Sequence, residues 1–213
     1  MKKLLVLAIA LTVTVSLNAQ DWSPESYKVG TVYEGHIIMK DGKKVAGFIE
    51  ANIRTKMQSK ITYWSVKGDK GTKETLTVKE ITSFTIAGKT WKAIAYSGGI
   101  SKKALNFNLH VKDGAIEEYV YYSKYTPSTD PKVKSTPPAS DYQGRKYESK
   151  NIYKNGDVIL AGDQLVIGFK KKMPLLVSDN SDMVTKIQAK EPGYKVTNRS
   201  KIIEEYNNWK SSK

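Results

Sequence analysis

A short motif constrains the fold most: an Asp-Gly or Asn-Gly pair placed between short runs in which apolar and polar residues alternate. It is clearest in residues 36–50, "HIIMKDGKKVAGFIE", where Asp41-Gly42 separates two alternating runs. This pattern predicts a β-hairpin closed by a two-residue turn, with Gly42 supplying the positive φ that the turn requires. Lys-Asp-Gly at 112–114 and Lys-Asn-Gly at 154–156 repeat the signal, so we expect a fold built from hairpins.

The same alternation extends over most of the chain. Strands are predicted in residues 31–51, 60–66, 72–78, 80–97, 104–122 and 151–172. In the segment after residue 104, Phe107 and Leu109 point one way, whereas Asn108 and His110 point the other. A period of two indicates strands with one buried and one solvent-facing side.

Near the C-terminus the spacing of apolar residues changes from two to about 3.6, which is the period of a helix. Residues 178–190 and 197–213 each place apolar side chains on one stripe. Ser178 and Ser181 are suitable N-caps for the first helix, and Asn198 or Ser200 for the second. The sequence therefore predicts an α+β fold. We expect mainly antiparallel β-hairpins, forming a twisted sheet or partial barrel, followed by two C-terminal helices.

The predicted elements divide the chain into consecutive regions. A β-hairpin-rich region covers residues 20–126, and a strand pair plus two helices covers 151–213, packed on the same sheet as one domain. Between them, residues 127–150 are rich in Pro, Ser and Lys and predict an exposed loop or linker. A lid over a ligand is the alternative interpretation of this loop.

The first residues predict export. Lys2 and Lys3 precede an apolar run from Leu4 to Leu17, and a short polar exit leads to Ala19-Gln20. This is typical of a cleaved secretory signal peptide over residues 1–19, and the run is shorter than the about 20 residues of a spanning helix. Because the chain has 0 cysteines, it cannot be a lipoprotein and cannot use thiol chemistry. We expect a periplasmic or secreted protein without a transmembrane segment.

The charge is strongly basic and is carried mainly by lysine. The net charge is +14, and without residues 1–19 there remain 33 basic and 21 acidic residues, a net +12. Arginine rather than lysine is favoured for bidentate recognition of bases and phosphates, so we expect no nucleic-acid partner. An anionic glycan or another envelope protein is the expected partner.

Two segments resemble an uncharacterised family of exported Bacteroidota proteins. The first runs from Gly35-His36-Ile37-Ile38 through Asp41-Gly42 to Val45-Ala46-Gly47-Phe48-Ile49, and is similar to that family's N-terminal "GDTIxGxI" hairpin. The second is the closing segment, which ends in Tyr206-Asn207-Asn208-Trp209 and is similar to a "YNxW" helix. The family has no established activity, so the resemblance implies no functional residue and no cofactor.

Candidate site residues are few. His36 and His110 could act as bases or ligands, but a metal site would need a third ligand such as Glu34 or Glu118, and no spacing enforces one. We interpret both as partly exposed strand residues and predict no catalytic, metal or cofactor-binding residue. Glu117-Glu118 is interpreted as solvated charge.

The densest aromatic stretch suggests a ligand-contact surface. Alternation sends Tyr119 and Tyr121 to one side of the strand and Tyr122 to the other, and Lys124 follows. Tyrosines on a sheet face can stack on sugars or peptides, with Lys124 assisting an anionic ligand. Cross-strand packing is the alternative.

Taken together, these patterns predict a non-catalytic envelope protein with a binding or scaffold role. One alternative is a binder of anionic envelope glycan or lipopolysaccharide, and a second is an enzyme acting on an envelope glycan or peptide.

Overall fold

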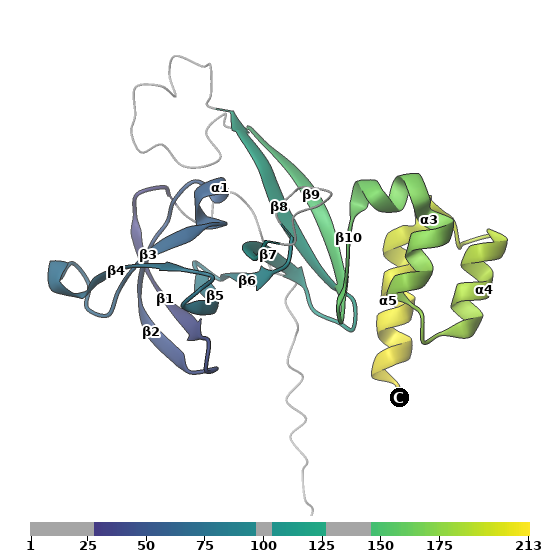
Figure 1. The fold of residues 1–213 in the computed structure, drawn as a ribbon, viewed down its shortest axis with the longest axis horizontal. Coiled ribbons are helices and arrows are strands. Elements are labelled where there is room, and N and C mark those ends of the chain that lie inside the picture. The colour runs from purple at the N-terminus through teal and green to yellow at the C-terminus, as the bar shows by residue number, and fades with distance from the viewer. Residues whose placement is uncertain (1–27, 97–103, 127–145) are drawn as a thin grey trace, which may run out of the picture.

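The computed structural model describes residues 28–96, 104–126 and 146–213. The expected signal peptide and residues 127–145 of the expected loop lie outside these ranges. Within them, strands in the order β10-β9-β8-β7-β6-β5-β1-β2-β3-β4 form one open 10-stranded sheet, and each neighbouring pair is antiparallel. Helices follow at the C-terminal end, so the α+β class is confirmed (Figure 1).

The strands match the predicted hairpins in order. They are β1 (Val32–Met39), β2 (Lys44–Glu50), β3 (Lys60–Trp64), β4 (Lys73–Thr77), β5 (Ile81–Ile86), β6 (Lys89–Ile94), β7 (Asn106–Lys112), β8 (Glu117–Thr126), β9 (Lys146–Asn155) and β10 (Val158–Ala161). The helices are α1 (Arg54–Met57), α3 (Gly162–Leu176), α4 (Ser181–Ala189) and α5 (Arg199–Ser211), with short 3₁₀ turns η2 (Lys70–Thr72) and η3 (Val196–Asn198). No helix in the described ranges combines the length and the apolar character needed to cross a bilayer.

The first hairpin confirms the role of Gly42 and corrects the predicted turn. Gly42 has a φ of 86°, as expected. The Met39 N–H donates to the Lys43 carbonyl at 2.9 Å and the Gly42 N–H donates to the Met39 carbonyl at 3.0 Å, so the connection contains residues 40–42 rather than two residues. A three-residue loop closed by a left-handed glycine is the next most common hairpin solution, which is why the same sequence signal fits both.

Two boundaries differ from the prediction. β9 begins at Lys146, inside the expected loop, because its residues extend the ladder with the distal half of β8. Residues 162–172, expected as strand, belong to α3, so three helices rather than two follow the sheet. The Gln164 side chain accepts from the Ala161 N–H at 3.0 Å, and Asp163 adds a negative charge in the first turn, where it favours a helix.

The helix pattern of α3 is masked by residues that usually interrupt helices. Leu165, Phe169 and Met173 recur at intervals of four and reach the helical core. Gly168 has non-helical angles (φ −130°, ψ 30°), and Pro174 lies inside the helix. The helix therefore contains a break at Gly168, and the preceding Val166 and Ile167 point away from the core, with 59% and 88% of their surface exposed.

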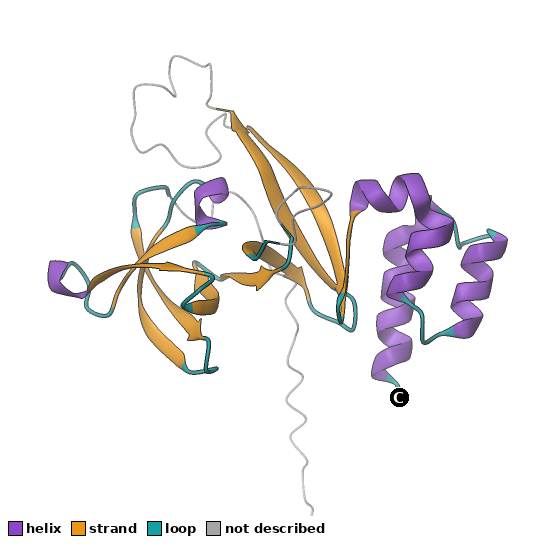
Figure 2. Ribbon diagram, viewed as in Figure 1, coloured by secondary structure: helices purple, strands orange, loops and turns teal. Residues whose placement is uncertain are grey.

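The apolar residues form two main cores on the same face of the sheet. The inner core is built by the curled first part of the sheet together with β6–β8, and contains Ile37, Ile49, Ala51, Met57, Ile61, Tyr63, Leu76, Ile81, Phe84, Ile86, Trp91, Phe107, Leu109, Val120 and Tyr122. The helical core packs α3, α4 and α5 on the other end of the β8–β9 ribbon, through Ile116 and Tyr153. Figure 2 shows these three helices gathered at one end of the molecule and the curled strands at the other.

A buried glutamine joins the first part of the sheet to β8. The Leu109–Val120 pair ends the β7–β8 register on this side, and Gln58, which is 5% exposed, occupies the next position. Its side chain accepts from the Tyr122 N–H at 2.6 Å and donates to the Tyr122 carbonyl at 3.0 Å, while its own carbonyl accepts from the Phe107 N–H at 2.9 Å. Gln58 therefore replaces one rung of the ladder and holds the sheet in its curled shape.

An asparagine of α5 makes the equivalent contact at the start of β8. The Asn207 side chain accepts from the Ile116 N–H at 2.7 Å and donates to the Ile116 carbonyl at 3.1 Å. A Cβ on Gly114 would lie 2.3 Å from the Asn207 amide nitrogen, so the close approach requires glycine there. Two side-chain amides thus complete the backbone hydrogen bonds near both ends of the buried part of β8.

Substituting Gln58 by leucine tests the first of these contacts. The variant loses both hydrogen bonds between the Gln58 side chain and the buried Tyr122 backbone, and losing a buried hydrogen bond costs about 1–3 kcal/mol. We expect the free energy of unfolding to fall by at least about 2 kcal/mol in urea titrations. Gln188→Leu, on the exposed face of α4, is the matched control and should change it by less than about 0.5 kcal/mol. Equal stabilities of the two variants would contradict the bridging role.

Candidate functional site

β8 separates the predicted site residues onto two faces, as its alternation requires. Val120 and Tyr122 lie in the inner core, whereas Tyr119 and Tyr121 lie on the opposite face, which we call the outer face. Tyr122 is 3% exposed and accepts a hydrogen bond from Arg54 at 3.2 Å. Tyr119 is 1% exposed. The burial of these two rings favours the cross-strand packing interpretation for them.

The remaining tyrosine and the lysine are placed less deeply. Tyr121 is half-buried on the outer face and packs edge-on against Tyr96, with ring centroids 5.3 Å apart. Lys124 lies in β8, but its side chain is outside what the structure describes. Ligand contact by these residues stays a prediction.

The structure does not bring the two histidines together. His36 is half-buried on β1, and strands β5 and β6 lie between it and His110 on β7. Three strand spacings correspond to about 14 Å along a sheet. His110 is 5% exposed, so the expectation that it lies partly exposed on a solvent-facing side is wrong. The reason is that the central strands of this sheet bury side chains on both faces.

His110 belongs to a group of charged and polar residues that we call the polar cluster, on the outer face of β6–β9 and in the turn before β8. Its members are Lys92, His110, Asp113, Glu117, Tyr119 and Lys154. The register explains the arrangement, because His110 pairs with Tyr119 on β8 and Glu117 pairs with Lys154 on β9. A register shift between His110 and Lys112 leads into the turn that carries Asp113.

Glu117 is the centre of the polar cluster, and its position corrects the interpretation of this residue as solvated charge. Its carboxylate accepts from Lys92 at 2.8 Å and from the Tyr119 hydroxyl at 2.5 Å, and it lies 3.7 Å from the Lys154 ammonium. The side chain is 23% exposed. A single half-buried carboxylate is therefore compensated by two lysines and one phenol.

The pKa values follow from burial and from these contacts. Burial alone raises the pKa of Glu117, but the hydrogen bonds from Lys92 and Tyr119 outweigh it and hold that pKa below its usual value. Burial, and then the hydrogen bond to Glu117, raises the pKa of Tyr119. Burial and the charge of Lys92 lower the pKa of His110. The imidazole is therefore neutral at pH 7.

The polar cluster has the ligand types of a metal site, but a lysine occupies its centre. Ligand atoms of His110, Asp113 and Glu117 lie within 4.8 Å of one another. The groups that join His110 are therefore Asp113 and Glu117 rather than His36 with Glu34 or Glu118, and Glu118 faces the other side. The Lys92 ammonium lies 3.3 Å from His110 Nε2, 3.7 Å from Asp113 Oδ1 and 2.8 Å from Glu117 Oε1. It supplies the positive charge that a metal ion would bring, so a metal could bind only after displacing it.

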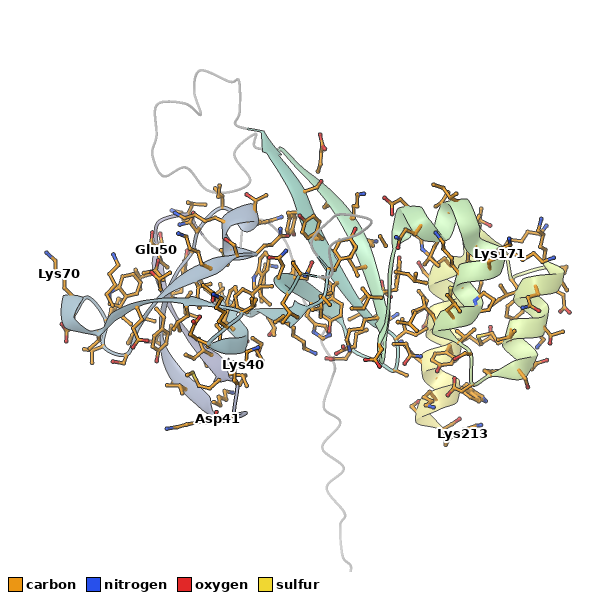
Figure 3. The ribbon with its side chains drawn as sticks, in the orientation of Figure 1. Lys40, Asp41, Glu50, Lys70, Lys171 and Lys213 are labelled. Carbon is orange, nitrogen blue, oxygen red and sulfur yellow. The ribbon has the colours of Figure 1, made fainter. Side chains whose placement is uncertain are left out.

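A second candidate site lies in the helical part, where an open groove of about 560 Å³ runs along α3, which we call the α3 groove. Its apolar wall comes from the exposed break in α3 and from the segment before α5. The lining residues are Val166, Ile167, Gly168, Phe169, Lys170, Lys171, Lys190, Tyr194, Lys195 and Val196. Figure 3 labels Lys171 at this end of the molecule.

The charge of the α3 groove is uncompensated, in contrast to that of the polar cluster. All four of its lysines are exposed, and no acidic side chain is among its lining residues. The nearby acids have other partners: Glu205 accepts from Tyr194 at 2.5 Å, and Asp182 pairs with Lys186 at 2.6 Å. Glu191 is exposed beside Lys190 but does not line the groove.

Sequence reasoning missed the α3 groove because it assigned its wall to a strand. The available signal was Val166-Ile167 before Gly168 and the run Lys170-Lys171-Lys172, an apolar pair followed by basic residues.

Comparison of the chain with protein-family models, with curated proteins and with solved structures finds no match. The resemblance of the first hairpin and the last helix to exported proteins therefore stays an interpretation of the sequence.

The lowered pKa of His110 predicts a pH dependence of stability. Below pH 6.5 the unfolded chain takes up a proton on this residue more readily than the folded chain does, so the free energy of unfolding should fall as the pH decreases. Glu117, whose pKa is also lowered, should add to this loss below about pH 4.5. Urea unfolding at about pH 7.5, 6.0 and 5.0, on both sides of the ordinary histidine pKa of about 6.5, measures the contribution of the histidine.

His110→Gln should flatten the dependence between about pH 6.5 and the folded-state pKa. His36→Gln is the control, because burial and Lys44 also lower the pKa of His36, which is less buried. Its substitution should therefore remove a smaller part of the slope. An unchanged slope in His110→Gln would show that the histidine titrates alike in both states.

Proposed function

We propose that the protein is a non-catalytic binding protein of the cell envelope, and that its ligand is acidic and docks in the α3 groove. One observation carries the proposal: four exposed lysines line the groove without an acidic side chain among them. Its volume of about 560 Å³ lies within the range of small-molecule sites, about 300–1,000 Å³. Exposed apolar residues beside uncompensated charge are typical of interaction surfaces.

The polar cluster supports the non-catalytic part of the proposal. A catalytic carboxylate or imidazole needs lone pairs or protons that remain available to a substrate. The Glu117 carboxylate instead accepts from Lys92 and Tyr119, and His110 is 5% exposed. These contacts use the groups to satisfy one another in the outer face of the sheet.

Export is the second part of the proposal and is supported by the order of Lys2, Lys3, the apolar run and Ala19. Protein purified from the periplasmic or culture fraction of the native host should begin near Gln20, as N-terminal sequencing or mass analysis would show. A chain that retains Met1 in the cytoplasm would contradict export, and an envelope ligand with it.

Charge reversal tests the groove. Lys170→Glu/Lys171→Glu should weaken binding to heparin and to lipopolysaccharide by at least about tenfold at low salt, since each lost lysine removes an attraction of about 1 kcal/mol. The matched control is Lys40→Glu/Lys70→Glu, which changes the net charge equally at sites that Figure 3 shows away from α3, α4 and α5. Titrations at two salt concentrations separate diffuse attraction from a shaped site.

If both variants lose affinity equally, the attraction belongs to the net charge and not to the groove. Binding by the unmodified protein that survives physiological salt, and that only the groove variant loses, is the expected result.

A further inference from the structure

The α3 groove combines two features that select different parts of a ligand. Its lysines can bind an anionic group, but its wall is apolar: Val166 and Ile167 are 59% and 88% exposed, and Phe169 and Val196 line the groove beside them. A purely polar anion would leave this surface in water. An exposed isoleucine contributes to the free energy of binding when an apolar group of the ligand covers it and removes it from water.

We infer that the ligand of the α3 groove is a single-chain anionic amphiphile, with its alkyl chain along Val166, Ile167 and Phe169 and its head group among the lysines. This inference rests on the proposed function and names the ligand class for it. Charge complementarity argues for the head group, because Lys170, Lys171, Lys190 and Lys195 line the same groove as the apolar residues.

The local backbone explains why this apolar surface is available. The buried stripe of α3 runs through Leu165, Phe169 and Met173, so an unbroken helix would still leave Val166 and Ile167 off the core. The break at Gly168 separates them from the lysine run that follows. The apolar pair and the lysines therefore lie on adjacent turns, within the length of one head group and the first part of its chain.

Chain length and head group are the two variables of the test, measured by calorimetry with dodecyl phosphate, octyl phosphate and dodecyl maltoside below their micelle concentrations. Each fully buried methylene contributes about fourfold in affinity. Because the groove is open, we expect dodecyl phosphate to bind about tenfold, rather than about 200-fold, more tightly than octyl phosphate. Dodecyl maltoside, which has the same chain and no charge, should bind at least about tenfold more weakly than dodecyl phosphate.

Substitutions in the wall separate the two parts of the site. Val166→Ser/Ile167→Ser should abolish the difference between dodecyl and octyl phosphate and leave the weak attraction of inorganic phosphate unchanged. Leu175→Ser is the control, because Leu175 is 51% exposed on the same helix but does not line the groove. All three residues are exposed, so thermal melts should confirm that the variants fold.

Equal affinity for the two alkyl phosphates, or for the maltoside and the phosphate, would overturn the inference. Binding to anionic vesicles without binding to the monomeric amphiphiles would also overturn it, because the ligand would then be a membrane surface. If heparin binding depends on Lys170 and Lys171 but the two alkyl phosphates bind equally, the proposed function holds and the inference about the amphiphile is wrong. Heparin binding that ignores these lysines would remove both.

Discussion

The amide of Gln58 is the contact on which the shape of the sheet depends. An open sheet of this length has no closing ladder of its own, so its curled first part must be attached to the strands it covers by other bonds. Gln58 provides them by hydrogen bonding to the backbone of Phe107 and Tyr122, where the β7–β8 ladder stops. The inner core therefore lies between two parts of one sheet. Gln58 joins them, because its side chain and its carbonyl make the hydrogen bonds that a paired strand residue would make.

Strand β8, to which Gln58 is bonded, also connects the first part of the sheet, the helices and the polar cluster. Just before β8 begins, Ile116 lies in the helical core and is bonded to Asn207 of α5. Further along, Val120 and Tyr122 of β8 lie in the inner core on the same face. On the other face Glu117 and Tyr119 hold the polar cluster together. At Tyr119, Val120 and Tyr122 the side chains on both faces of β8 are buried in the protein itself, and the ligand that we propose docks elsewhere, in the α3 groove.

The sequence predicted the turns and strands, which depend on neighbouring residues. It did not predict burial and side-chain pairing, which depend on residues far apart in the chain. The Asp-Gly and Asn-Gly turns and the period-2 runs placed the hairpins, since turn conformation and alternation depend on neighbouring residues. The burial of His110 could not be predicted, because it depends on the side chains that the neighbouring strands and the turn before β8 place around it, among them Lys92, Asp113 and Tyr119. The pairing of Lys92 with Glu117 joins residues on β6 and β8 that share no motif. In α3 a true signal, the spacing of Leu165, Phe169 and Met173, was outweighed by Gly162, Gly168 and Pro174, which usually end helices.

The two amides that hold β8 also set an order in which the chain can fold. Gln58 bonds 64 residues ahead, to Tyr122, and Asn207 bonds 91 residues back, to Ile116. Closing such long loops costs entropy before any contact compensates it, and antiparallel sheets rich in distant pairings fold slowly. The bond between Asn207 and Ile116 cannot form until α5 has been synthesised. A chain emerging from the ribosome therefore lacks this contact until synthesis is nearly complete. Late completion of the fold suits the export that we propose, because a chain passes through a translocation channel before it has folded.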